Sequence, residues 1–210
     1  MIELLNVDCM DYMKGLEDKA FNLACVDPPY GINVNVSMGR RKNQKASGYH
    51  KFYGGDVEPP DSSYFVELQR VSKNQIVWGA NHFITHMILA FNVDSPCWLM
   101  WDKGFSDKVT FAQFELAWTS FNGTCKKYDR SPNDKNRIHP TQKPVKLYEW
   151  LLENYAKPGD RILDTHLGSG SSAIAAHYGG FDFVGCELDE DYYNAAKTRI
   201  DLSTRQIALF

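Results

Sequence analysis

The sequence predicts one α/β domain in which a mostly parallel β-sheet is covered by helices on both faces. Short apolar runs alternate along the chain with segments that repeat apolar residues at helical spacing. Alternation of this kind is typical of parallel strands joined by helices. The 210 residues are 43% hydrophobic, which suits a single compact domain over residues 1–210.

Apolar runs of strand length define the predicted sheet. In chain order they are IELLNV (2–7), NLACVD (22–27), QIVWGA (75–80), CWLMWD (97–102), FELAWTSF (114–121), RILDT (161–165) and FDFVGCEL (181–188). We expect the tryptophans of these runs to pack in the core, and the same is expected of three cysteines, Cys25, Cys97 and Cys186.

Four segments carry the spacing of helices with one apolar side. They are SSYFVELQRVSK (62–73), PVKLYEWLLENYAK (144–157), SSAIAAHYG (171–179) and DEDYYNAAKTRI (189–200). Pro144 suits a first helical turn, and Pro158-Gly159 is expected to close the same helix. The last helix is expected to finish near Asp201.

Residues 33–60 and 122–140 show no clear period, and both are basic. Long irregular segments inside a compact domain are usually functional or disordered. Local basic patches suit phosphate contacts even though the net charge is −3, but they are also common on solvated loops. The candidates for phosphate contacts are Arg40, Arg41, Lys42, Lys45, Lys51, Lys126, Lys127 and Arg130.

Several classes of protein are disfavoured by the sequence. The five cysteines are widely spaced with no CxxC pair, which argues against a disulfide framework or a zinc cluster. No apolar run approaches the ~20 residues of a membrane span, and the N-terminus does not resemble a secretory signal. We therefore expect a cytoplasmic protein. His82 and His86 stand four apart, but Phe83 breaks the HExxH pattern, so no metal is expected.

The first chemical motif is Asp27-Pro28-Pro29-Tyr30, at the end of a predicted strand. Ligands of open α/β sheets bind beyond the carboxyl ends of strands. A carboxylate and a neighbouring carbonyl can accept both hydrogens of an exocyclic base amine and localise its lone pair. Asp27 and the Pro28 carbonyl are placed for this, and Tyr30 offers an aromatic face to an extruded base. The alternative is a structural Pro-Pro turn.

The second motif, RILDTHLGSGSSAIAAH (161–177), predicts a cofactor site. A strand ending at Asp164 leads into Gly168-Ser169-Gly170 and a helix, and the next strand ends at Glu187. Such a fingerprint also fits a nicotinamide-dependent dehydrogenase. However, a dehydrogenase has no use for the first motif, and Asp164 suits the amino group of a bound amino acid. S-adenosylmethionine has that group and a ribose, without phosphate.

The two motifs together resemble the DNA amino-methyltransferases of the beta class, in which DPPY precedes the cofactor loop. The resemblance implies a Rossmann-like, circularly permuted fold that binds S-adenosylmethionine. It implies an adenine contact for Asp8, a ribose contact for Glu187, and contacts to the methionine carboxylate for Thr141 and Lys143. The cofactor loop would comprise Asp164, Gly168, Ser169, Gly170 and Ser171. The DPPY form favours N6 of adenine; N4 of cytosine is the alternative.

The resemblance also implies a mechanism and partners. The target base of double-stranded DNA would flip out, and methyl transfer would be direct and metal-free. An inactive DNA-binding homologue is a further alternative, but both half-sites are intact. Site recognition would use residues 122–140 with residues 33–51, or a second subunit. A homodimer is suggested by family analogy alone.

The C-terminal tail, residues 204–210, carries one more pattern. Gln206, Leu209 and Phe210 resemble the Gln-x-x-Leu-Phe peptides by which bacterial DNA enzymes dock on the sliding clamp. The alternative is a tail that folds back on its own domain and buries Leu209 and Phe210.

Overall fold

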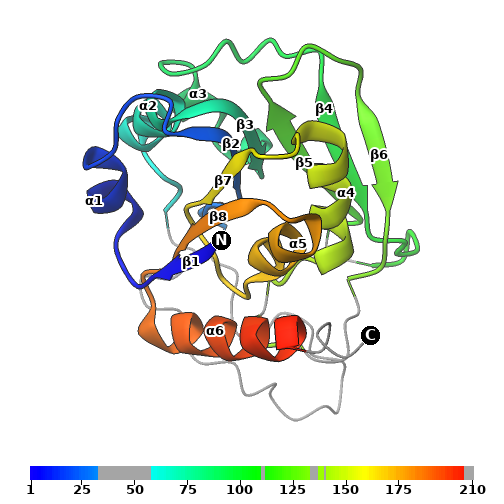
Figure 1. The fold of residues 1–210 in the computed structure, drawn as a ribbon. Helices are drawn as coiled ribbons and strands as arrows, with labels where there is room; N and C mark the ends of the chain where they lie inside the picture. Colours follow the sequence, from blue (N-terminus) through cyan, green and yellow to red (C-terminus); the bar gives the residue numbers. More distant parts are fainter. Residues whose placement is uncertain (33–57, 110–111, 133–136, 140, 206–210) are drawn as a thin grey trace.

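The sheet runs through the whole molecule, and the helices lie on both sides of it (Figure 1). The computed structural model describes residues 1–32, 58–109, 112–132, 137–139 and 141–205. The strands are β1 (Ile2–Leu5), β2 (Phe21–Val26), β3 (Ser72–Trp78), β4 (Trp98–Asp102), β5 (Phe114–Thr119), β6 (Lys126–Asp129), β7 (Arg161–Asp164) and β8 (Asp182–Cys186). Each predicted apolar run therefore overlaps a strand.

The strand order is β1-β8-β7-β2-β3-β5-β4-β6. Neighbours pair in parallel from β1 to β3, and β4 also pairs in parallel with β6. Only β5 is antiparallel to its neighbours, β3 and β4, within this sheet. The predicted mostly parallel α/β architecture is confirmed.

One strand was not predicted. Residues 126–129, within a segment expected to lack regular structure, form β6 and pair with β4 from Leu99↔Lys126 to Asp102↔Asp129. The sequence KKYD has no apolar alternation because β6 is the last strand at its edge of the sheet and is mostly exposed. Its strand character comes from backbone pairing with β4, which the local sequence does not reveal.

The helices are α1 (Cys9–Lys14), α2 (Ser62–Val71), α3 (Ile84–Met87), α4 (Val145–Tyr155), α5 (Ser171–Gly179) and α6 (Glu190–Arg205), with a short 3-10 turn, η1 (Ala80–His82). The four predicted helices are confirmed. The expected end of the last helix near Asp201 is wrong, since α6 continues to Arg205. Its final turn is stabilised by hydrogen bonds from the Thr204 hydroxyl to the carbonyls of Ile200 and Asp201.

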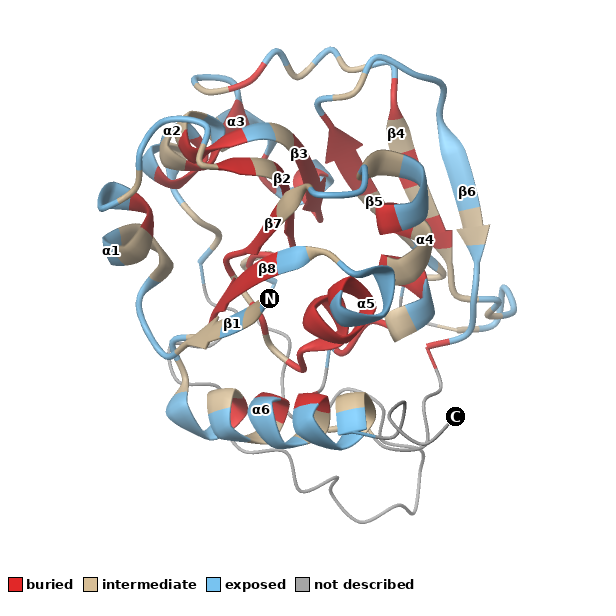
Figure 2. Cartoon of the chain, in the orientation of Figure 1, coloured by how far each residue is buried: buried red, intermediate tan, exposed pale blue. Residues whose placement is uncertain are grey.

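Two apolar clusters, one on each face of the sheet, form the core (Figure 2). The first packs side chains of α4, α5 and α6 against the sheet, and the second packs those of α1, α2 and α3. The central strand β2 serves both clusters, with Leu23 and Cys25 on one side and Ala24 and Val26 on the other. The expected burial of the three cysteines and of most strand tryptophans is confirmed: Cys25, Cys97, Cys186, Trp78, Trp101 and Trp118 are buried, and Trp98 is half-buried.

The sheet topology places a switch point between two central strands. β7 and β2 are adjacent and parallel, with Leu23 opposite Ile162 and Ala24 opposite Leu163. After β7 the chain turns to α5 on one face, whereas the helix that follows β2, α2, lies on the other. Ligands of open α/β sheets bind at such a switch point, at the carboxyl ends of the strands.

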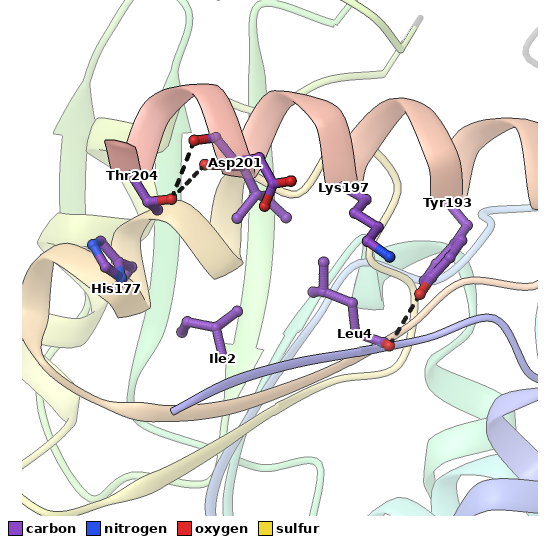
Figure 3. Close-up of a pocket in the computed structure, with 8 residues that line it drawn as sticks. Ile2, Leu4, His177, Tyr193, Lys197, Asp201 and Thr204 are labelled. Carbon is purple, nitrogen blue, oxygen red and sulfur yellow. Dashed lines mark hydrogen bonds between the residues drawn. The ribbon is translucent and has the colours of Figure 1, made fainter. Parts of the chain in front are cut away.

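A pocket of about 270 Å³ opens elsewhere, between β1 and α6 (Figure 3). The Tyr193 hydroxyl donates to the carbonyl of Leu4 across it at 3.3 Å. It is lined by Ile2, Leu4, His177, Tyr193, Lys197, Ile200, Asp201 and Thr204. Of these, His177 is the last residue of the second motif, and the others lie outside both motifs. No helix in the described part of the chain is long and apolar enough to cross a membrane.

Candidate active site

The Asp-Pro-Pro-Tyr motif leaves β2 and folds back over its own acid. The Tyr30 hydroxyl donates to Asp27 Oδ1 at 2.7 Å. Gly79, directly after β3, has φ +70°, and a Cβ atom on it would lie 2.1 Å from Cε1 of Tyr30. The glycine therefore provides the space that the tyrosine ring occupies.

His82 also belongs to this site, although its sequence context gave it no role. Its ring stacks on Tyr30 with centroids 5.1 Å apart and an interplanar angle of 15°. The ring of Phe83 lies 6.3 Å from Tyr30 in a tilted arrangement. Tyr30 is thus held by aromatic neighbours from the segment after β3 as well as by Asp27.

A chain of alternating charges leads from the sheet to Asp27. Lys143, in the segment before α4, forms ion pairs with Asp27 and with Glu115 of β5, the latter at 2.9 Å. Glu115 is paired in turn with Lys103 at 2.6 Å. The Lys143 side chain is only 3% exposed, so these charges interact in a poorly solvated environment.

Burial and neighbouring charges perturb the pKa values of this cluster. Burial raises the pKa of Asp27, although the ammonium of Lys143 opposes the rise. Burial also acts to raise the pKa of Glu115, but Lys143 and Lys103 outweigh it and lower that pKa to about 2. For Lys143, burial acts to lower the pKa, and the carboxylates of Asp27 and Glu115 outweigh it and raise it. Glu115 and Lys143 are therefore both ionised at neutral pH.

Asp164 ends β7 at the switch point between β7 and β2 and is buried. Its carboxylate accepts hydrogen bonds from the Ser172 hydroxyl at 2.5 Å and the His166 amide at 3.0 Å. Burial, with smaller contributions from the charges of Asp27 and Glu187, raises its pKa to about 7. A ligand ammonium placed here would offset the cost of burying this carboxylate.

The loop between Asp164 and α5 has the form expected of a cofactor cradle. Gly168 and Gly170 adopt φ +50° and +74°. The Gly168 amide donates to Glu187 Oε2 at 2.8 Å, which joins the loop to the end of β8. Arg199 of α6 donates to the Ser169 carbonyl at 2.7 Å and to the Ser171 hydroxyl at 3.0 Å.

The segment before α4 adds polar groups to the site. The Thr141 and His139 side chains are 3.0 Å apart. Burial, together with the positive charges of Lys143 and Arg137, lowers the pKa of His139 to about 3, so its ring is neutral. Gln142 is buried, and its Nε2 has no hydrogen-bond partner among the described residues. A buried donor of this kind suits an anionic ligand group.

These residues fit S-adenosylmethionine chemically. Asp164 suits its ammonium, Nε2 of Gln142, which has no partner among the described residues, suits its carboxylate, and Glu187 stands where strand β8 ends. Asp8 follows β1 at the same edge of the sheet, and its carboxylate caps α1 by accepting from the amides of Met10 and Asp11. Lys143 differs from expectation, because its ammonium contacts Asp27 and Glu115.

Of the residues predicted to contact DNA, some lie outside the described part of the chain and the others lie in or next to β6. Arg40, Arg41, Lys42, Lys45 and Lys51 lie outside the described residues, as do Gln206, Leu209 and Phe210. Lys126 and Lys127 lie in β6 and Arg130 follows it. Lys127 is paired with Asp102 and Asp129, and Lys126 donates to Asn154. Three strands separate β6 from β2. At normal strand spacing, β6 therefore lies about 19 Å from β2, the strand that leads to Asp27.

The sequence interpretation missed Glu115, Lys103 and His139. Glu115 was visible as the single acid of the apolar run FELAWTSF, and a charge inside a buried strand is usually paired. Nothing local indicated that its partner would be Lys143, 28 residues away in the chain, since that pairing depends on the strand order.

The fold, with charged groups at the carboxyl ends of the adjacent strands β2 and β7, is typical of α/β enzymes that bind a nucleoside-type cofactor. The sequence matches the DNA methylase family over residues 61–198, and the chain belongs to that family.

Two of the similar proteins are YubD of Escherichia coli (strain K12), named as a methylase, and M1.HpyAVI. YubD is 24% identical over 95% of this chain and 90% of its own. The structure of the M1.HpyAVI–SAM complex superimposes with a TM-score of 0.63 at 19% identity, covering 95% of this chain and 100% of that chain. The cytosine-N4-specific PvuII DNA methyltransferase has a TM-score of 0.66 at 10% identity, covering 98% of this chain and 92% of the other.

Proposed function

We propose that this protein transfers a methyl group from S-adenosylmethionine to N6 of adenine in double-stranded DNA. The observation that carries the proposal is the juxtaposition of Asp27 and Asp164 at the carboxyl ends of the adjacent parallel strands β2 and β7. One carboxylate suits a cofactor ammonium and the other suits the amine to be methylated. Membership of the DNA methylase family supports the same conclusion.

Asp164, Gln142, Thr141 and Glu187 would hold the cofactor around the glycine loop, with Asp8 at the edge of β1. S-adenosylmethionine, when bound, supplies a methyl group activated by its sulfonium. The complex of M1.HpyAVI with SAM, a protein of the same fold, supports this assignment.

Asp27 and the Pro28 carbonyl would accept the two hydrogens of the target amine and direct its lone pair toward the cofactor. The rings of Pro28 and Pro29 fix φ and keep this turn rigid, and the carbonyls of the turn stay available as acceptors. Tyr30 would contact the flipped base, with His82 supporting its ring. Most of the rate gain would come from alignment of two bound reactants.

Adenine is the proposed base because the motif is DPPY. The alternative, N4 of cytosine, has one specific observation in its favour, since the cytosine-N4-specific PvuII enzyme shares the fold. The chemistry of Asp27 would be the same for either base, because both present an exocyclic amine.

DNA contacts would involve the basic residues of segment 33–57 together with Lys126, Lys127 and Arg130. The homodimer, the cytoplasmic location and the docking of Gln206, Leu209 and Phe210 on a sliding clamp are further parts of the proposal. α6 reaches Arg205, so a docking peptide would follow the helix directly. Clamp retention of the full chain, compared with a chain lacking its last five residues, tests that part.

Nucleoside mass spectrometry of unmethylated DNA treated with the protein and S-adenosylmethionine tests the function. We expect N6-methyladenine with the wild type and none with Asp27→Ala, which should still bind the cofactor. N4-methylcytosine would leave the mechanism in place and change the base. Absence of any methylated base with the wild type, while cofactor binding is intact, would contradict the proposal.

A further inference from the structure

We propose that Lys143, anchored by Glu115, is a positioning residue that keeps the carboxylate of Asp27 ionised and oriented toward the amine to be methylated. The inference rests on the proposed function and deepens it. It assigns Lys143 to the catalytic carboxylate, whereas the family resemblance implies a contact with the carboxylate of the cofactor. It also gives a role to Glu115, which belongs to neither motif.

The contacts of the Lys143 ammonium carry this inference. An ammonium has three hydrogens to donate. Lys143 donates to Asp27 Oδ2, to Glu115 Oε2 at 2.9 Å and to the Tyr30 hydroxyl at 3.2 Å. Its charge also lies 5.6 Å and 5.5 Å from the ring centroids of Tyr30 and Trp78. The protein therefore satisfies the ammonium fully, and a cofactor carboxylate could reach it only by displacing one of these acceptors.

Asp27 needs a cation because its surroundings disfavour its charge. The groups that face it are the carboxylates of Glu115 on β5 and Asp164 on β7, the hydroxyls of Tyr30 and of Tyr148 on α4, the thiol of Cys25 and the ammonium of Lys143. Among the described residues, Lys143 is the cation in direct contact with Asp27. A protonated Asp27 would accept the amine hydrogens poorly, so loss of the ammonium would remove the reactive form at neutral pH.

Glu115 has the opposite influence. It holds one side of the Lys143 ammonium and is itself held by Lys103 at 2.6 Å. Because it shares Lys143 with Asp27, it weakens the pull of the ammonium on Asp27 and leaves that carboxylate available to the amine. The negative charge of Glu115 acts to raise the pKa of Asp27, whereas the positive charge of Lys143 acts to lower it. Removal of the two groups should therefore shift the ionisation of Asp27 in opposite directions.

The rate of DNA methylation, measured across pH at saturating cofactor, tests this arrangement. For Lys143→Met we expect the midpoint of the acid limb to rise by about one pH unit or more, with activity returning at high pH. For Glu115→Gln we expect the midpoint to fall and the maximal rate to drop. The affinity of Lys143→Met for S-adenosylmethionine should stay within about threefold of the wild type. Loss of a direct contact with the cofactor would instead lower the affinity by about tenfold, or 1.4 kcal/mol, or more.

Two further variants separate charge from damage to the fold. Lys143→Arg keeps the charge and should keep the wild-type midpoint. Lys146→Met removes an exposed lysine three residues further along the chain, which is paired with Glu149. This variant should also keep the wild-type midpoint. If Lys143→Met does not fold, the downward shift in Glu115→Gln still decides the question.

Two results would overturn the inference. The first is a wild-type midpoint in both Lys143→Met and Glu115→Gln. The second is a large loss of cofactor affinity in Lys143→Met with no change of midpoint, which would assign Lys143 to the cofactor. A wild-type protein that binds cofactor but does not methylate DNA would instead contradict the proposed function itself.

Discussion

At the scale of single residues, the site depends on one position where only glycine fits. Gly79 follows β3 directly with φ +70°, and its missing side chain leaves room for the Tyr30 ring. Tyr30 in turn donates to Asp27 Oδ1. The geometry of the catalytic carboxylate therefore depends on a glycine 52 residues further along the chain.

We expect Gly79→Ala to cost about 1–3 kcal/mol of stability, because alanine is strained at positive φ and its Cβ would meet the ring. Methylation should fall more than cofactor affinity. Gly104→Ala is the matched control, since Gly104 has φ +67° with nothing within 4 Å of the added atom. Chemical unfolding of the two variants measures the difference; equal losses of stability and activity would refute a role for the Tyr30 contact.

A second expectation at this scale concerns Asp164, whose pKa is raised to about 7. A carboxylate must be ionised to bind an ammonium, so cofactor affinity should weaken as the pH falls below 7. For one titrating carboxylate, the affinity for the cofactor can fall by at most about tenfold per pH unit. In the free protein the native state binds more protons than the unfolded chain between the two pKa values, so this group makes stability fall as the pH rises from about 4 to 7.

Calorimetric titration with S-adenosylmethionine at several pH values provides the measurement. Asp164→Asn should bind weakly and lose this pH dependence, while Asp27→Ala should keep it. An unchanged pH dependence in Asp164→Asn would show that another group is responsible.

At the scale of secondary-structure elements, α6 acts as a brace for the cofactor loop. Arg199 reaches from its middle to the Ser169 carbonyl and the Ser171 hydroxyl. Ile200, one residue on, packs so closely over Gly170 that a Cβ there would lie 2.7 Å from it. Helix α6 thus holds the cofactor loop in place, although no residue of α6 is predicted to contact the cofactor.

We expect Arg199→Ala to weaken cofactor binding by about tenfold, since hydrogen bonds from a charged donor contribute about 1.5–3 kcal/mol. Arg205→Ala is the control, because Arg205 lies on the same helix, is exposed and pairs with Asp201. Fluorescence titration with the cofactor compares them. Equal affinities for Arg199→Ala and the wild type would mean that the loop is rigid without the brace.

At the scale of the whole molecule, the sheet order joins two sites that are far apart in the sequence. Asp27 and Asp164 meet because β2 and β7 are neighbours, and Glu115 joins them because β5 follows β3. The strands and long helices could be predicted from apolar periodicity, and the motifs gave Asp27 and Asp164. The Glu115–Lys143 pair could not be predicted, because it arises from tertiary contacts. Strand β6 could not be predicted from its sequence KKYD, because an exposed edge strand needs no apolar pattern.

We propose that Asp27 serves methyl transfer to DNA while Asp164 and its loop serve the cofactor. The most direct test is single-turnover transfer of a labelled methyl group from saturating S-adenosylmethionine to unmethylated double-stranded DNA. We expect label in DNA with the wild type and a rate lower by about 100-fold or more with Asp27→Ala. Transfer by Asp27→Ala at the wild-type rate, or label entering RNA and not DNA, would contradict it.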